Sequence, residues 1–156
     1  MTQQGSMDDK IGKRIFKIYD PLFSQSVTVF INCEEDDFMK WQKRLNVVNA
    51  DGLDPNLIAF TTYVSADGEP SRYVIWLTHF DWTLDDQESL VHECIHAVIR
   101  IWKANNIPVS IDNQEFLAHS AGKLYSMIGA KLFHKKLKGK AYNKTKLLNN
   151  SPPSLV

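Results

Sequence analysis

The stretch L-D-D-Q-E-S-L-V-H-E-C-I-H-A-V-I-R-I-W-K, residues 84–103, sets the fold that we expect for this chain. Its apolar residues recur at helical spacing, so it predicts one amphipathic helix. Thr83 and Asp86 have the spacing of a capping box, which places the start of the helix near Leu84. The residues expected to end it are Asn105, Asn106 and Pro108. The stripe predicted to be buried comprises Val91, Cys94, Ile95, Val98, Ile101 and Trp102.

Inside this helix lies the run H-E-C-I-H, residues 92–96, which is a complete H-E-x-x-H motif. Residues four apart lie on one face of a helix, so the imidazoles of His92 and His96 are expected to converge on one Zn²⁺ ion. Glu93 between them is the predicted general base, acting on a water held at the metal. Cys94 points away from that face, and we expect a core thiol there.

A catalytic zinc site needs about three protein ligands and one open position, and the two histidines supply only two ligands. Glu115 is the preferred third ligand, on a helix that returns toward the first. His119, one turn later, is an alternative third ligand or a hydrogen-bond donor to the oxyanion of the reaction. Tyr125 and His79 are further candidate donors. Glu115 also has the spacing to close a capping box with Asp112, which leaves its role open.

The helix that carries Glu115 is expected to begin near Asp112 or Asn113 and to run past Lys131. One flank of it holds only small residues, and small side chains let a neighbouring backbone approach closely. We therefore expect this flank to pack against the helix of residues 84–103. The small residues are Ala118, Gly122, Ser126 and Gly129.

The first half of the chain predicts a small sheet with one helix. Strands are expected at Ile15–Ile18 and Val27–Ile31, a helix at Glu34–Leu45, and a hairpin of two strands at Leu57–Ser65 and Arg72–Thr78. The expected fold class is therefore α+β, with an antiparallel or mixed sheet of about four strands packed on three helices. The last two helices are expected to carry the metal site.

Length and composition favour a single domain. We expect a flexible N-terminus at 1–12, one domain at 13–134 and a basic, disordered tail at 135–156. The 18 basic and 18 acidic residues balance, which indicates neither nucleic-acid nor membrane binding. The two cysteines, together with the lack of a signal-peptide pattern, favour a cytoplasmic protein without a disulfide framework.

The text H-E-C-I-H-A followed by D-N-Q-E-F-L-A-H-S-A-G-K-L resembles the zincin metallopeptidases whose third ligand is a glutamate. It is also similar to small metallopeptidases encoded in bacteriophage genomes. The resemblance covers about a third of the chain, 85–132. It implies Zn²⁺ as cofactor, His92, His96 and Glu115 as ligands, Glu93 as general base, and a peptide or protein substrate.

The phage resemblance further implies the host cytoplasm or the virion as location, and phage structural proteins as partners. The chain departs from large zincins because it has no second catalytic subdomain and no evident propeptide. His119 also stands where an aromatic residue is expected. A second hypothesis is therefore a virion or assembly protein that keeps a zincin fold with a structural or vestigial metal site. A zinc ion with four protein ligands would favour it, because no position remains for water.

Overall fold

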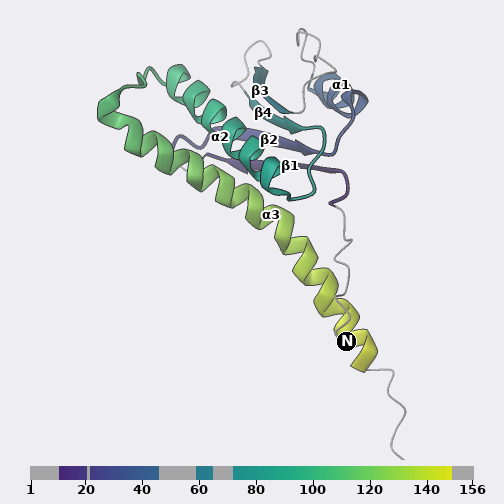
Figure 1. The fold of residues 1–156 in the computed structure, drawn as a ribbon. Helices are drawn as coiled ribbons and strands as arrows, with labels where there is room; N and C mark the ends of the chain where they lie inside the picture. The colour runs from purple at the N-terminus through teal and green to yellow at the C-terminus, as the bar shows by residue number, and fades with distance from the viewer. Residues whose placement is uncertain (1–10, 21, 46–58, 65–71, 149–156) are drawn as a thin grey trace, which may run out of the picture.

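A computed structural model describes residues 11–20, 22–45, 59–64 and 72–148, with side chains up to residue 133. Its elements are four strands, three α-helices and one 3₁₀ helix in these ranges (Figure 1). In chain order they are β1 (Arg14–Tyr19), β2 (Ser26–Ile31), α1 (Glu35–Arg44), β3 (Ala59–Val64), β4 (Arg72–Leu77), α2 (Leu84–Ala104), η1 (Ile111–Asn113) and α3 (Gln114–Leu148).

The strands form one mixed sheet in the order β1-β2-β4-β3. β1 pairs antiparallel with β2, β2 pairs parallel with β4, and β3 pairs antiparallel with β4. The central strands β2 and β4 are buried along almost their whole length, as strands covered on both faces must be. β3 is an edge strand of the described sheet, which matters for the site below.

The two faces of the sheet bury different clusters, because successive side chains of a strand point to opposite faces. Val27, Val29 and Ile31 of β2 join the larger cluster, which also contains the buried residues of α2 and α3. Phe30 belongs to a second cluster with Phe38 of α1. The sheet is therefore the middle layer of three, with α1 on one face and the pair α2–α3 on the other.

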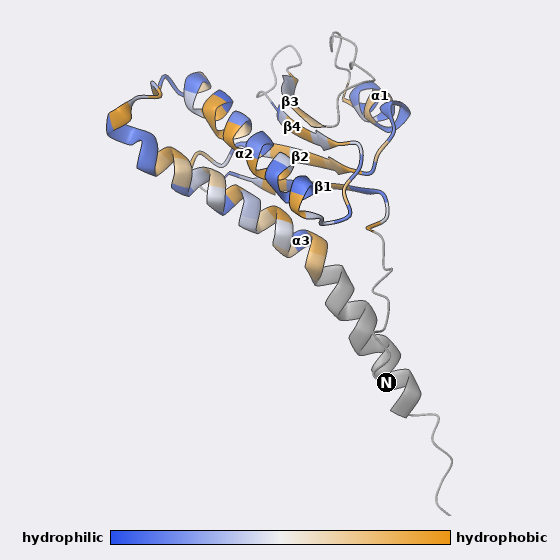
Figure 2. Cartoon of the chain, viewed as in Figure 1, coloured by the Kyte–Doolittle hydropathy of each residue, from blue (hydrophilic) through white to orange (hydrophobic). Residues whose placement is uncertain are grey.

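The α1 face is aromatic. Phe38 stacks on Trp76 with ring centroids 5.9 Å apart, and Phe30 meets Phe38 edge-on at 5.6 Å. The remaining surface of α1 is polar, and most of that helix carries hydrophilic colours in Figure 2. Its first turn contains three acids and its last turn two bases, which complements the helix dipole.

α2 and α3 form an antiparallel hairpin beneath the other face (Figure 1). At one end Trp102 of α2 packs on Phe116 of α3, with centroids 5.6 Å apart. At the other end the Tyr125 hydroxyl donates to Gln87 Oε1 at 3.1 Å, and Tyr125 stacks on Trp82. The part of α3 between Phe116 and Tyr125 therefore lies opposite the part of α2 that contains the H-E-x-x-H motif.

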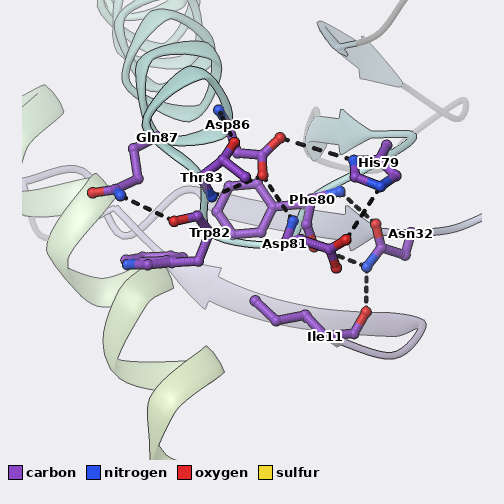
Figure 3. Close-up of polar contacts among 9 residues, drawn as sticks. All are labelled: Ile11, Asn32, His79, Phe80, Asp81, Trp82, Thr83, Asp86 and Gln87. Atoms are coloured by element: carbon purple, nitrogen blue, oxygen red, sulfur yellow. Dashed lines mark hydrogen bonds and ion pairs between the residues drawn. The ribbon is translucent and has the colours of Figure 1, made fainter. Parts of the chain in front are cut away.

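A polar brace ties the N-terminal end of α2 to the sheet (Figure 3). The Asn32 side chain, just after β2, accepts from Phe80 N at 2.6 Å and donates to the Phe80 carbonyl at 3.0 Å and to the Ile11 carbonyl. The Asp86 carboxylate accepts from the amides of Asp81 (2.8 Å) and Thr83 (3.0 Å). We call Asn32, Phe80 and Asp86 with these contacts the brace.

The expected α+β class, with a four-stranded mixed sheet and three helices, is confirmed, as is the antiparallel pairing of the 57–65 and 72–78 strands. The predicted capping box of Thr83 and Asp86 is present, with Thr83 as N-cap. None of the described helices is long and apolar enough to cross a membrane.

The predicted domain boundaries stay predictions. α3 is helical to Leu148, so its backbone continues into the segment expected to be a disordered tail. The rest of that tail, 149–156, lies outside the described residues, as do the first ten residues of the predicted flexible N-terminus.

Two expectations about packing are wrong. Val91 and Ile95 were predicted to be buried, but they are 41% and 37% exposed, and Leu90 and Ala97 are buried instead. The cause is that α2 packs against β3 and β4 as well as α3, which rotates its buried face toward the sheet. The small flank of α3 is also not a close contact along its length, because a Cβ added at Gly122 would meet nothing within 4 Å.

Candidate metal centre

His92 and His96 converge on the outer face of α2. Their Nε2 atoms are 2.9 Å apart and their ring centroids 4.5 Å apart, with the rings nearly perpendicular. Both side chains are exposed, and the pair forms because one helical turn separates them. Two imidazole nitrogens that face each other at this distance share either a proton or a metal ion.

Glu93 lies on the flank of α2 that faces β3 and is 95% buried, since only 5% of its surface is exposed. The Thr61 hydroxyl of β3 donates to Glu93 Oε2 at 2.5 Å and lies 3.0 Å from the Glu93 carbonyl oxygen. A buried carboxylate is costly without such a donor. Thr61 of β3 therefore fixes the orientation of the predicted general base on the flank of α2 that faces the sheet, whereas His92 and His96 lie on the exposed face.

Cys94 behaves as predicted, as a core thiol. It is fully buried and unpaired in the larger cluster. Burial raises the pKa of the Cys94 thiol far above its usual range, and the charge of Glu93 raises it further. Because the thiolate is the form that binds metal, Cys94 does not compete with the two histidines.

A shallow groove runs between α2 and α3 on the same outer side as His92. Its volume is about 520 Å³, and Val91, Ile95, His92 and Tyr125 line it together with Gln87 and Glu88. The exposure of Val91 and Ile95 is thereby explained, since they form the apolar floor of this groove. Gly122 of α3 adds no side chain that would fill space nearby.

The two predicted third ligands, Glu115 and His119, lie on α3 and are both exposed. His119 belongs to the stretch of α3 opposite the motif, whereas Glu115 precedes Phe116, which packs on Trp102, six residues after His96. The side chains of Glu115 and His119 are not gathered around the histidine pair: no three His, Cys, Asp or Glu side chains among the described residues are placed to hold one metal ion. The choice between Glu115 and His119 stays open.

The competing role for Glu115, closing a capping box with Asp112, is not what the structure shows. At this end Ser110 is the N-cap of η1, and its amide donates to Asn113 Oδ1 at 3.0 Å. Ser110 and Asn113 therefore make the capping box, and α3 begins only at Gln114. The Glu115 carboxylate is left exposed on the first turn of α3.

Of the other candidate donors, His79 lies at the N-terminal end of α2, with Nε2 3.3 Å from Asp81 and Nδ1 4.0 Å from Asp86. It lies before the first residue of α2, Leu84, at the end of the helix that the brace holds. Leu84 is itself eight residues, or about 12 Å of helix rise, from His92, so His79 is far from the histidine pair. Tyr125 lines the groove beside His92, although its hydroxyl donates to Gln87. Tyr125 is the better placed of the two.

Thr61 is a residue that sequence reasoning missed. It sits 32 positions before Glu93, and nothing in a run such as A-F-T-T-Y-V shows which threonine will face a helix. The usable signal is alternation, because a hydroxyl at an inward position of an otherwise apolar strand needs a partner.

In comparisons with known proteins, no family model matches the chain, and no curated protein or solved structure is significantly similar to it.

Proposed function

We propose that this chain is a zinc-dependent metallopeptidase in which His92 and His96 bind the metal and Glu93 is the general base. The observation that carries the proposal is the convergence of the two Nε2 atoms, 2.9 Å apart, on a turn of α2 that also carries the buried Glu93. Two nitrogen ligands about 2.05 Å from a tetrahedral Zn²⁺ ion are about 3.3 Å apart, so the pair needs only a small adjustment. The histidine pair therefore suits two of the ligand positions of a zinc ion.

Glu115 is the proposed third ligand. It is exposed, it is not held in a capping box, and it lies on α3, which packs against α2. Its neighbour Phe116 packs on Trp102, six residues or about 9 Å of helix rise beyond His96, so binding by Glu115 would require the first turn of α3 to shift toward the motif. His119 remains the alternative on the same helix. When bound, Zn²⁺ would supply a Lewis acid that lowers the pKa of a water molecule and polarises a carbonyl group.

Glu93 would take a proton from the attacking water and pass it to the leaving amine. Thr61 fixes the orientation of the carboxylate, and its hydrogen bond occupies only one of the two carboxylate oxygens. The second oxygen keeps its lone pairs for the proton transfer. Thr61 is thus proposed as a positioning residue, while Glu93 touches the reacting atoms.

The substrate would be a peptide or protein segment that lies along β3. Because β3 is an edge strand in the described sheet, its outer backbone N–H and C=O groups are open to an added strand. Thr61 of this strand contacts Glu93, so an extended peptide on its edge would pass close to the base. The phage origin and phage partners inferred by resemblance are a further part of this proposal, and they rest on the motif residues alone.

The test is a comparison of zinc content and hydrolysis in the purified full chain. We expect about one Zn²⁺ per chain in the wild type, and its loss in His92→Ala and His96→Ala. Glu93→Gln is expected to keep the metal and to cleave an unfolded protein substrate about 10² to 10⁴ times more slowly. His79→Ala, which removes a histidine at the other end of α2, is the matched control and is expected to keep the metal.

Each result has a separate meaning. Absence of zinc from the wild type would overturn the proposal as a whole. Equal turnover by wild type and Glu93→Gln would remove the general-base role. Zinc in the wild type without hydrolysis of any peptide would favour the second hypothesis, a virion or assembly protein with a structural metal site.

The third ligand has its own experiment, zinc affinity measured by competition with a chelator. Glu115→Ala is expected to weaken binding by at least tenfold, because a ligand is lost, whereas His119→Ala is expected to change it by less. The reverse order would assign the ligand to His119. Equal losses in both variants would indicate a site with four protein ligands and would count against hydrolysis.

A further inference from the structure

A second pocket lies beside the C-terminal half of α2, on the same flank as Glu93. Its volume is about 220 Å³, and Tyr63, Tyr73, Arg100, Lys103 and Ala104 line it. Tyr63 and Tyr73 are directly paired across β3 and β4 and form one wall. Arg100 and Lys103 of α2 form the other. We call this the Tyr63–Arg100 pocket, and the proposed catalytic residues do not use it.

The chemistry of this pocket suits an anion. The Arg100 guanidinium lies 6.0 Å from the centre of the Tyr63 ring, a cation–π contact that orders the side chain and leaves its N–H groups available. Among the residues that the structure describes, neither Arg100 nor Lys103 takes part in an ion pair. Cations in a last helical turn also complement the helix dipole, but that role requires neither the tyrosine wall nor the hollow.

Among the residues that the structure describes, Asp20 is the carboxylate whose charge acts on Tyr73 of the pocket. Burial raises the pKa of the Tyr73 hydroxyl, and the charge of Asp20 raises it further. Asp20 is itself buried, and its Oδ2 accepts from the amides of Leu22 (3.1 Å) and Phe23 (2.7 Å) in the turn after β1. Its charge is therefore satisfied locally, and it does not pair with Arg100.

The pocket lies at a definite distance from the proposed reaction centre. Glu93 and Arg100 are seven residues apart, so they lie on the same face of α2 and about 10.5 Å apart along it. Along β3 the matching contacts are Thr61 with Glu93 and Tyr63 with Arg100. The interval is thus two residues along β3 and, at about 3.3 Å per residue of an extended peptide, about three residues along α2.

We propose that the Tyr63–Arg100 pocket binds a carboxylate of the substrate two to about three residues from the bond that is cut. The substrate class is therefore a peptide with either an acidic side chain or a free C-terminus at that position. This inference rests on the proposed function for the meaning of the distance. The binding site itself does not depend on zinc or on Glu93.

A peptide is favoured over a nucleic acid by the size of the hollow and by charge. The cavity of about 220 Å³ fits a side chain or a chain end, and only two cations line it. The chain as a whole carries no net positive charge, whereas nucleic-acid binding needs many phosphate contacts. A single carboxylate matches the fork of one arginine.

The test measures peptide affinity by fluorescence anisotropy with the full chain. The reference probe is an uncharged all-Gln octapeptide with an acetylated N-terminus and an amidated C-terminus, and in the other probes a single Glu replaces Gln at each position in turn. A further all-Gln octapeptide keeps its free C-terminal carboxylate and separates the two sources of the anion. Each probe is measured once with added Zn²⁺ and once with a chelator, and a short thymidine oligonucleotide serves as the nucleic-acid probe.

We expect one Glu position, or the free carboxylate, to bind about three- to tenfold more tightly than the neutral peptide. Arg100→Gln is expected to abolish this preference, and Arg100→Lys to keep part of it. Arg44→Gln, which removes an exposed arginine at the end of α1 on the other side of the sheet, should leave it unchanged.

Equal affinity for all peptides, or no binding of any of them, would overturn the inference even if the chain hydrolyses peptides. So would a preference for the oligonucleotide that Arg100→Gln removes. An Arg100-dependent preference that persists with the chelator, in a chain without hydrolytic activity, would support the pocket and refute the proposed function. The two failures are therefore distinguishable.

Discussion

The first turn of α2 and the turn that carries His92 and His96 belong to one helix, but they differ in their contacts with the rest of the chain. The first turn is fixed by the brace, in which the Asn32 amide and the Asp86 carboxylate satisfy backbone groups of the preceding loop. Two turns later the histidines are exposed and contact each other through Nε2. The contacts that anchor α2 to the sheet and the histidines of the candidate site thus lie at different positions along the helix.

The difference teaches how a small domain can present ligands. In the proposed metal site, the nitrogens of His92 and His96 must keep their lone pairs available, so these two residues cannot also anchor the helix. Glu93 lies between the two cases, because it is buried and held by Thr61 yet keeps one carboxylate oxygen unused by that bond. Substitutions in the brace and substitutions near the exposed side of α2, which carries His92 and His96, should therefore differ in their effects on stability.

The largest expected effect comes from breaking the brace at Asn32. Asn32→Ala removes three hydrogen bonds and leaves a residue at a φ of 53°, where alanine is strained. The free energy of unfolding should fall by roughly 2 to 4 kcal/mol, measured by urea denaturation. Asn106→Ala is the control, since Asn106 has a φ of 58° at the end of α2 and reports the backbone cost alone. Equal losses in the two variants would contradict the role of the hydrogen bonds.

Next comes the contact between the edge strand and the base. Thr61→Val preserves shape but removes the hydroxyl that donates to Glu93, so a buried carboxylate loses its donor. We expect a loss of about 1 to 3 kcal/mol in unfolding free energy. Thr61→Ser, which keeps the hydroxyl, should recover most of it. An unchanged denaturation midpoint in Thr61→Val would show that Glu93 is held by something else.

A smaller effect, one that depends on pH, is expected at Asp86. Burial raises the pKa of its carboxyl, but the amides of Asp81 and Thr83, the Thr83 hydroxyl and His79 together lower it below the usual value. A lowered pKa in the folded state stabilises the protein above the unfolded pKa of about 4, and this stability is lost as the pH falls through the folded pKa. Asp86→Asn should therefore be less stable by about 1 kcal/mol at neutral pH.

Thermal denaturation from pH 7 down to pH 2 checks this expectation. The gap between wild type and Asp86→Asn should be constant near neutrality and should close in acid. Asp85→Asn, in the same turn but exposed, should show a smaller gap. A gap that widens as the pH falls would have the wrong sign for a carboxylate with a lowered pKa.

The smallest expected change in stability concerns Gly122 on the exposed flank of α3. Gly122→Ala adds a Cβ that meets nothing within 4 Å, so the gain in helix propensity should stabilise the chain by about 0.5 to 1 kcal/mol. Gly129→Ala is the matched control, because its Cβ would lie 3.3 Å from Trp82 Cη2 and force the ring to move. A larger gain at Gly129 than at Gly122 would mean that Trp82 does not crowd Gly129, contrary to the contact described.

Local features of this molecule could be predicted from sequence, because they depend on residues a few positions apart. The Thr83–Asp86 capping box, the β3–β4 pair and the meeting of His92 with His96 are of this kind. Apart from the C-terminal end of α3, which runs to Leu148, the expected elements likewise match those observed to within a few residues.

Long-range features could not be predicted. The parallel pairing of β2 with β4 joins Val27 to Tyr73, and no local pattern specifies a partner at that separation. The exposure of Val91 was missed for the same reason, since an apolar stripe does not reveal whether a sheet or a second helix will cover it. The third metal ligand depends on how α3 lies over α2 and on exposed rotamers, and it therefore stays a prediction.

The burial of the two cysteines on opposite faces of the sheet makes the chain its own labelling probe. Cys33 lies in the aromatic cluster beneath α1, and Cys94 lies in the cluster beneath α2 and α3. Alkylating reagents modify a buried thiol only when its layer opens, and each thiol has a raised pKa because burial disfavours its charged form. The rates of alkylation at the two positions would thus reveal which layer of the native protein detaches first, without any substitution in the chain.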